Sequence, residues 1–500
     1  MSETTLPSKP TPWTWRDPAP HDHAAFDPRD VFAAGLRNHH IANTAYPIAH
    51  QVTWKPYRIA RPDHVEVASR GLARGADGGY DDMCLYVHVP FCEVRCSFCE
   101  YTVVKRQEHA LMGAYVDAMV REVARWDDTV GLKGRRIHGL DVGGGTPSML
   151  PAEDVERVLT AIRERVQFVD GSDISIETTP KIAAADKDKI RAYRAMGIDR
   201  ISMGIQVIQP DLLKVLNRSE NGIEHHTHAV DHIRAAGFDR LNLDLMYGFA
   251  DQSLESWEAT LDHAIGLGPE YITLYRMRYK LTRISDQASR VSLDQVRPMQ
   301  TMATAKLHEA GYAANPGKTN DAKIDGDVGT SADWRRRVQD GMPDLGIGLG
   351  AQTFTHTTIS YASGSAGKNL APYLKDMESE GVLPLQDLYD LPRTQMMGKT
   401  CAVSFYFGEI REAPFVEKFG CTLSDAFPDV VDFVISDGLM EWTGEGASRA
   451  LSLTKRGAAS KNGVIPLFAA PSIQQHLIER DPHHDVELER SRKIALRVAG

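Results

Sequence analysis

The stretch Leu85–Tyr101, LYVHVPFCEVRCSFCEY, decides how this 500-residue chain is interpreted. A β-rich run at Cys84–Val89 leads directly into a loop that holds three cysteines, Cys92, Cys96 and Cys99. Closely spaced thiolates after a strand are typical of iron–sulfur sites, and a four-iron cluster normally takes four of them. Three thiolates would leave one iron open for another ligand. The loop therefore predicts a [4Fe–4S] cluster with one open position.

A zinc site is the alternative for the same loop, because zinc also takes thiolate and imidazole ligands. Cys84 or a distant histidine would complete it. Zinc sites usually pair cysteines as two C-x₂-C units, so the C-x₃-C-x₂-C spacing favours the cluster.

A histidine-rich segment gives a second candidate metal site. It contains His225, His226, His228 and His232, and Glu224 shares one helix face with the last two. Because this segment lies away from the expected strand ends, we interpret it as the solvated face of an amphipathic helix.

Five further β-rich runs follow and alternate with segments of helical periodicity. They are Ile137–Val142, Ile174–Glu177, Arg200–Ile205, Arg240–Met246 and Tyr271–Arg276. Such alternation predicts right-handed βαβ units and a parallel sheet. Six units are fewer than a closed eightfold barrel needs. We therefore expect an α/β fold with a partial (β/α)₆ barrel, whose reactive residues lie at the C-terminal ends of the strands.

The chain divides into three predicted parts: an N-terminal arm and extension over 1–79, the barrel over 80–290, and an accessory domain over 291–500. The first twenty residues hold five prolines, which exclude a regular helix there. Two short apolar runs flank a glycine-containing turn within Phe433–Ala458. This pattern predicts a mainly helical, winged-helix-like C-terminal domain that covers the substrate.

The charge balance argues against two classes of partner. Lys and Arg number 57 against 67 Asp and Glu, a net charge of −10, so we expect neither a nucleic-acid nor a membrane partner. No run approaches the roughly 18 apolar residues of a membrane span, and the N-terminus lacks a signal-peptide pattern. Six cysteines are too few for a disulfide framework. We expect a cytoplasmic monomer.

Several motifs, in order along the chain, carry a family resemblance. They are YVHVPFC at Tyr86–Cys92, GGGTPS at Gly143–Ser148, SIETTP around Glu177, SMGIQ ending at Gln206, LNR ending at Arg218, NLDLMYG containing Asp244, and GLGAQTF at Gly348–Phe354. With these motifs the chain resembles the branch of the radical S-adenosylmethionine (SAM) enzymes typified by oxygen-independent coproporphyrinogen III dehydrogenase, the HemN-like family. The likeness runs from about Tyr46 to about Thr454.

The resemblance implies that Cys92, Cys96 and Cys99 bind the cluster and that the amino and carboxylate groups of SAM chelate the open iron. It also implies a set of SAM-binding residues: Tyr86, Phe98, Gly143, Gly144, Gly145, Thr146, Glu177, Gln206, Arg218, Asp244 and Gln352. The glycine carbonyls would accept from the methionine ammonium, and Arg218 would pair with the carboxylate. The implied products are methionine and a 5′-deoxyadenosyl radical, with the electron supplied by a partner such as flavodoxin or ferredoxin.

The position two residues after Cys99 separates the activities within the family. Coproporphyrinogen dehydrogenases carry a fourth cysteine there, whereas this chain has Tyr101. Relatives without it include radical methyltransferases and cyclopropanating enzymes that bind two SAM molecules, one as radical source and one as carbon donor. We therefore expect transfer of a methyl or methylene unit to an sp² carbon of a small aromatic or natural-product substrate.

Two alternatives stay open, namely oxidative decarboxylation of the coproporphyrinogen type and haem binding as a chaperone. The candidate catalytic residues are Tyr86, Arg276, Arg278 and Tyr279, and the last three, with Gln352, are candidates for contact with the substrate or a second SAM.

Overall fold

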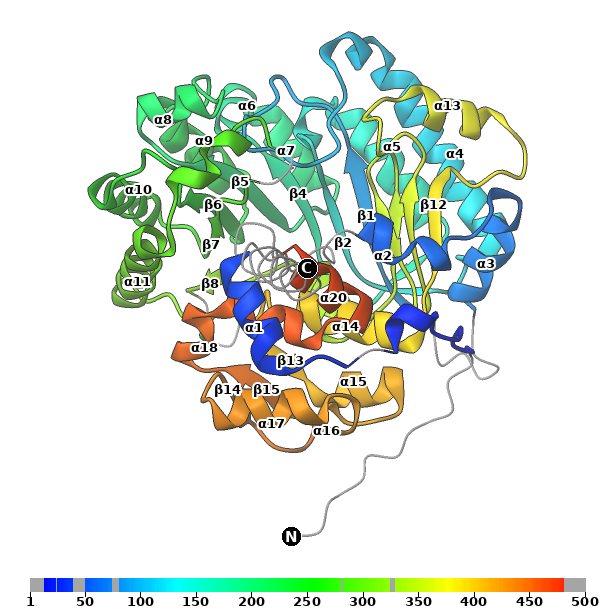
Figure 1. Ribbon diagram of the computed structural model, residues 1–500. Helices are drawn as coiled ribbons and strands as arrows, with labels where there is room; N and C mark the ends of the chain where they lie inside the picture. The colour runs from blue at the N-terminus through cyan, green and yellow to red at the C-terminus, as the bar shows by residue number, and fades with distance from the viewer. Residues whose placement is uncertain are drawn as a thin grey trace, which may run out of the picture.

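The computed structural model describes residues 13–23, 25–38, 50–73, 81–279, 282–323 and 329–480. Its largest element is a twelve-stranded mixed sheet, which contains six parallel neighbours that are joined by helices (Figure 1). These are β1 (Asp82–Val89), β2 (Arg136–Gly144), β4 (Ile174–Thr178), β5 (Arg200–Gln206), β6 (Leu241–Tyr247) and β7 (Tyr271–Arg276). All six match the β-rich runs of the sequence. The predicted partial barrel is confirmed.

Helices follow each of these strands and cover the outer face of the sheet (Figure 1). They are α4 (Met112–Val130), α5 (Ala152–Arg163), α6 (Pro180–Ala185), α7 (Lys187–Ala195), α8 (Pro210–Val215), α9 (Ile223–Ala235), α10 (Leu254–Gly266) and, after β7, α11 (Leu293–Glu309), which packs on α10. Local signals set their ends. Ser253 accepts a hydrogen bond from the backbone of Ser256 at the start of α10, and Gly131 ends α4 in the left-handed conformation.

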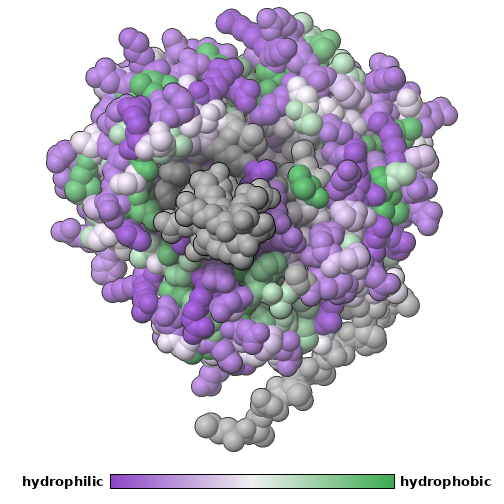
Figure 2. Space-filling model, in the orientation of Figure 1, coloured by the Kyte–Doolittle hydropathy of each residue, from purple (hydrophilic) through white to green (hydrophobic). Residues whose placement is uncertain are grey.

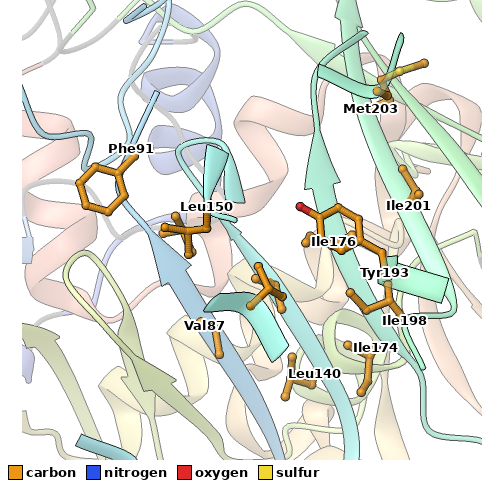
Figure 3. Packing of buried hydrophobic residues seen from close by; sticks show 14 of the residues in the cluster. Val87, Phe91, Leu140, Leu150, Ile174, Ile176, Tyr193, Ile198, Ile201 and Met203 are labelled. Carbon is orange, nitrogen blue, oxygen red and sulfur yellow. The ribbon is translucent and has the colours of Figure 1, made fainter. Parts of the chain in front are cut away.

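The two faces of the parallel strands differ in polarity, which places the core outside the barrel lumen. Apolar side chains such as Val87, Leu140 and Ile176 pack with Tyr193 and other residues of the helical layer (Figure 3). The opposite face holds polar side chains that are hydrogen-bonded to one another across neighbouring strands. They are Asp141 with Ser175, and Ser202, Asn242, Asp244 and Thr273. The lumen is therefore lined by polar groups.

The sheet continues past the parallel strands on both sides. On one side β8 (Asn320–Ala322) runs antiparallel to β7, and on the other β9 (Asp344–Ile347) runs parallel to β1. An antiparallel series completes that side: β10 (Gln352–Phe354), β11 (Thr358–Ala362) and β12 (Leu385–Asp390). The short β3 (Gln167–Phe168) pairs with β2. The main sheet thus extends beyond residue 290, where the sequence placed a domain boundary, and the boundaries themselves stay predictions.

A helix fills the N-terminal end of the lumen. This helix, α12 (Ala332–Gln339), begins against Gly139 of β2, where an added Cβ would lie 2.1 Å from the backbone nitrogen of Asp333. Ser331 donates to Asp141 at 2.7 Å, and the backbone of Ala332 donates to Asp173 at 2.9 Å. The barrel therefore has a closed floor, and its open end lies at the C-terminal ends of the strands.

The C-terminal part is mainly helical around a small sheet, as predicted. The antiparallel strands β13 (Glu409–Arg411), β15 (Ala450–Leu453) and β14 (Met440–Thr443) lie below the barrel in Figure 1. The helices of this part and of the segment that joins it to the barrel are α11 (Leu293–Glu309), α13 (Ala371–Glu378), α14 (Arg393–Ser404), α15 (Glu412–Phe419), α16 (Leu423–Ala426), α17 (Pro428–Ser436), α18 (Lys455–Ala459), α19 (Lys461–Val464) and α20 (Pro471–Glu479).

The described part of the N-terminal arm is built into this C-terminal core. Its helices are α1 (Pro28–Arg37), α2 (His50–Thr53) and α3 (His64–Gly71), and α1 packs on α19 and α20. Asp22 is buried and accepts hydrogen bonds from Tyr57 and Gln395. The prolines Pro7, Pro10 and Pro12 lie outside the described residues.

The described helices include none with the length and apolar character to cross a membrane. The face shown in Figure 2 is mainly hydrophilic, with hydrophobic side chains scattered across it.

Candidate active site

An open cavity lies at the C-terminal ends of the parallel strands. Its volume is about 1450 Å³ with the space of the open mouth included. The cysteine loop, the ends of β2 and β4–β7, and Tyr406 after α14 line it. The structure brings these sequence-predicted residues to the cavity: Cys92, Cys96, Cys99, Phe98, Gly144, Gly145, Thr146, Glu177, Gln206, Arg218, Asp244, Arg276 and Arg278.

The cysteine loop is held against the end of β2. Thr146 donates from Oγ1 to the Sγ of Cys92 at 3.4 Å. A Cβ on Gly145 would lie 2.6 Å from the carbonyl oxygen of Phe91 and 3.1 Å from the Sγ of Cys92, so only glycine fits at this contact. Desolvation by the surrounding protein raises the pKa of Cys92 to about 12. A thiolate there therefore needs a positive partner, which bound iron would supply.

Arg218 contacts the cysteine loop from the side of β5. Its Nη1 donates to the Sγ of Cys96 at 3.4 Å and its Nη2 to the carbonyl oxygen of Gly204 at 2.6 Å. The pairing of Arg218 with the SAM carboxylate stays a prediction, and the guanidinium is directed at Cys96. Only 7% of the residue is exposed, so the charge acts in a partly desolvated site.

The three consecutive glycines make different contacts. Gly144, with φ of +114°, lies under the His88 ring, where a Cβ would come within 2.7 Å of it. Gly143 does not line the cavity; a Cβ there would lie 3.1 Å from the Tyr86 hydroxyl and 3.0 Å from Glu177. The run thus allows close packing under the cysteine loop, and Gly144 and Gly145 also border the cavity.

Two carboxyl groups border the cavity from β4 and β6. Glu177 opens into the cavity deep in the barrel, where desolvation, with the negative Asp244 and Asp141 nearby, raises its pKa to about 8. Desolvation also raises the pKa of Asp244, opposed by hydrogen bonds from Asn242 at 2.8 Å and Ser202 at 3.2 Å. Both groups are poised to gain negative charge when a cation binds beside them.

Gln206 ends β5 in a strained backbone conformation. Its φ of +69° is left-handed, and the pairing with β6 shifts between Gly204 and Gln206. A non-glycine residue in this region costs about 1–3 kcal/mol, and such strain is concentrated at functional sites. The shift turns the Gln206 side chain toward the cavity wall, where it is 9% exposed.

Besides Gly143, three predicted residues are not among those that line the cavity. Tyr86 lies beneath Gly143, and its hydroxyl is 3.2 Å from Nδ1 of His88. Tyr279 is 1% exposed and donates to the carbonyl oxygen of Gly248 at 3.1 Å, so its catalytic assignment is not supported by its position. Gln352 lies on β10, three strands away from β2 in the sheet. Its family motif supports the sheet at this point instead of the cavity wall.

His88 and three tyrosines were not assigned roles from the sequence. His88 is buried, and desolvation lowers its pKa to about 4, so the ring is neutral. Its Nε2 donates to the carbonyl oxygen of Thr102 at 2.9 Å, which leaves Nδ1 to accept from Tyr86. Tyr101, Tyr275 and Tyr406 line the cavity. Tyr275 lies at the end of a predicted strand, so its position at the cavity could have been predicted from the sequence. No feature of the sequence indicated Tyr406.

The comparisons with known proteins agree with this geometry. The model of the Radical SAM superfamily matches residues 86–264. An oxygen-independent coproporphyrinogen III oxidase of Cereibacter sphaeroides is 30% identical over 314 residues, which cover 60% of this chain and 67% of that protein. The chain belongs to the HemN-like family of radical SAM enzymes.

Other relatives of this HemN-like protein carry two different names. The oxygen-independent coproporphyrinogen III oxidase of Synechocystis is 27% identical over 77% of this chain and 84% of its own length. The haem chaperone HemW of Haemophilus influenzae is 29% identical over 47% of this chain and 63% of its own length. The solved structure of coproporphyrinogen III oxidase (HemN) from Escherichia coli has a TM-score of 0.65, at 24% identity, and covers 80% of this chain and 93% of that one. That likeness supports the fold.

The family implies a [4Fe–4S] cluster and SAM, and the HemN-like site fits both. Three thiols from one loop border a single cavity, and Arg218 places a positive charge beside one of them. Among the described residues, no three His, Cys, Asp or Glu side chains converge closely enough to hold a single metal ion. The family match and the spacing of the three cysteines therefore favour a cluster over the zinc alternative.

The histidine-rich segment lies on α9 of the HemN-like barrel, away from the cavity. Nδ1 of His226 is 2.9 Å from Nε2 of His263 on α10, and His232 contacts the carbonyl oxygen of Ala183 at 2.9 Å. These residues hold neighbouring helices together.

Proposed function

We propose that this HemN-like protein is a radical SAM enzyme that removes a hydrogen atom from a carboxylate-bearing, unsaturated ring substrate. The observation that carries the proposal is one cavity that joins the three cysteines to Arg276 and Arg278. When bound, a reduced [4Fe–4S] cluster supplies the electron that cleaves SAM to methionine and a 5′-deoxyadenosyl radical. The reaction class is that of the coproporphyrinogen III oxidases to which the chain is similar, oxidative loss of a carboxylate.

The residues on the two sides of the cavity have complementary charges for these ligands. Glu177 and Asp244 face the cavity from β4 and β6, where a cationic amino group or ribose hydroxyls would find acceptors. Arg276 and Arg278 border it from β7 and the segment that follows, where substrate carboxylates would find bidentate donors. Arg278 is also 3.2 Å from Glu100. The rings of Tyr275 and Tyr406 offer surfaces on which a flat substrate would pack.

A second candidate function is carbon transfer from a second SAM molecule to an sp² carbon. Tyr101, at the position of the fourth cysteine of the coproporphyrinogen enzymes, favours it. This candidate rests on the sequence; the relatives described above carry the names of an oxidase and a haem chaperone. For both candidate functions we propose that flavodoxin or ferredoxin delivers the electron and that the protein is a monomer.

One anaerobic experiment separates the candidates. The cluster is reconstituted, and 5′-deoxyadenosine, S-adenosylhomocysteine and CO₂ are measured with SAM, dithionite and either coproporphyrinogen III or a panel of aromatic compounds. Deoxyadenosine with CO₂ supports decarboxylation, and deoxyadenosine with S-adenosylhomocysteine supports carbon transfer. Retention of haem without any substrate-dependent deoxyadenosine would overturn both and favour the chaperone.

A further inference from the structure

Lys368 reaches the cluster loop from a distant part of the chain. It lies between β11 and α13, and its Nζ donates to the carbonyl oxygens of Glu100 at 2.9 Å and Tyr101 at 2.7 Å. These two carbonyls directly follow Cys99. A second contact joins the same segments, because the hydroxyl of Thr102 donates to the carbonyl oxygen of Ser365 at 3.4 Å. The backbone after the third cluster cysteine is therefore fastened to the sheet extension.

The backbone of Lys368 is itself strained. Its φ of +50° makes it one of three described non-glycine residues in the left-handed region, and another of these is Gln206 at the cavity. Glycine would adopt this conformation without cost, and glycines stand nearby at Gly364 and Gly367. A long cationic side chain at such a position indicates that the side chain has a role that offsets the strain.

The charges around Cys99 are mainly positive. Arg95 donates from Nη2 to the carbonyl oxygen of Cys99 at 3.3 Å, and Lys368 adds an ammonium on the next two carbonyls. The carboxylate of the next residue, Glu100, is paired with Arg278 at 3.2 Å. Reduction makes an iron–sulfur cluster more negative, so fixed positive charge beside it stabilises the reduced form.

We propose that Lys368 is a positioning residue for the iron–sulfur cluster, which fixes the backbone after Cys99 and raises the reduction potential of the cluster through its charge. The inference rests on the cluster that the proposed function requires. It adds a role for a residue about 270 positions away from the cysteines in the sequence.

The test measures the reduction potential of the cluster in the full-length protein, not turnover. Lys368→Met removes the charge and both hydrogen bonds, whereas Lys368→Arg keeps a cation at the same place. Lys455→Met on α18 removes an exposed lysine far along the chain and serves as the control. Each reconstituted protein is titrated with reductant, followed by electron paramagnetic resonance, and its iron content is measured in parallel.

The expected result is a lower midpoint potential for Lys368→Met than for the wild type, with Lys368→Arg and Lys455→Met close to the wild type. A purely structural role would reduce iron content or thermal stability without moving the potential of the clusters that remain. The same potential in Lys368→Met and wild type would therefore overturn the inference, even at reduced cluster occupancy. Absence of any cluster in the wild type would instead overturn the proposed function, and this inference with it.

Discussion

The guanidinium of Arg218 lies 3.4 Å from the Sγ of Cys96 and also binds the carbonyl oxygen of Gly204. One side chain thus ties the cysteine loop to the end of β5, next to the strained Gln206. Because the contact is made to a cysteine of the loop, we expect Arg218 to act on a bound cluster directly and on SAM through it.

Replacing Arg218 with glutamine should weaken both cluster binding and SAM cleavage. A hydrogen bond from a charged group contributes about 1.5–3 kcal/mol, so the rate of SAM cleavage should fall about 10- to 100-fold. The measurements are iron content and deoxyadenosine formation with dithionite. Arg191→Gln is the control, since Arg191 makes an exposed ion pair with Asp188. Wild-type values in Arg218→Gln would contradict the assigned contact.

Removing a cluster ligand should abolish the cluster. Cys96→Ala should lose the bound iron and the visible absorbance of the reconstituted protein, because two thiolates do not hold a four-iron cluster. Cys421→Ala removes a partly buried cysteine of the C-terminal part and should keep both signals. Full iron and absorbance in Cys96→Ala would refute the cluster assignment.

Adding one methyl group at Gly145 should displace the cysteine loop. The new Cβ would lie 2.6 Å from the carbonyl oxygen of Phe91 and 2.9 Å from that of Val89, and backbone atoms at these distances must move. We expect Gly145→Ala to fold but to bind markedly less iron. Gly113→Ala, at the start of α4, has nothing within 4 Å of the new Cβ and should gain about 0.5–1 kcal/mol of stability. Equal iron content in the two variants would show that the close contact is not needed.

The raised pKa of Glu177 predicts opposite pH trends for stability and for SAM binding. The ligand-free folded protein keeps the Glu177 proton up to a pKa of about 8, whereas the unfolded chain loses it near the ordinary value of 4.5. This group therefore lowers the stability of the ligand-free protein as pH rises from about 4.5 to about 8. The carboxylate form attracts the cationic SAM, so affinity should rise over the same range.

Melting temperatures with and without SAM between pH 6 and pH 9 test both trends. Glu177→Gln should flatten them, and Glu164→Gln, an exposed carboxylate on the edge of α5, should leave them unchanged. A pH dependence that survives in Glu177→Gln would assign it to another group.

The six parallel strands were predictable because each carries a short run of apolar residues and is followed by a segment with helical periodicity, and the cysteine loop was predictable from the spacing of its cysteines. The strands β8–β12 were not, since they are three to six residues long and their antiparallel pairing depends on partners elsewhere in the sheet. Their segments are rich in threonine and glycine, as in Gly348–Tyr361, and carry no periodic signal.

The expectation that reactive residues lie at the C-terminal ends of parallel strands correctly placed Glu177, Asp244 and Arg276 at one cavity. It failed for Tyr279, whose hydroxyl is used by the backbone of Gly248, and it gave no hint of Lys368 or Tyr406. Those two come from segments after the barrel, and their contacts with the cysteine loop or the cavity arise from tertiary packing. The spacing of residues along the sequence does not predict such long-range contacts.

Helix α12 fills the N-terminal end of the barrel lumen, so the cavity opens only at the C-terminal ends of the strands. Molecules enter and leave by the same mouth, and whichever binds deepest is trapped until the molecule above it departs. The molecule that binds deepest would then be loaded first and released last. If SAM binds deepest, a substrate that binds first would block access to the SAM site. The enzyme would then show substrate inhibition, and a higher SAM concentration would relieve it.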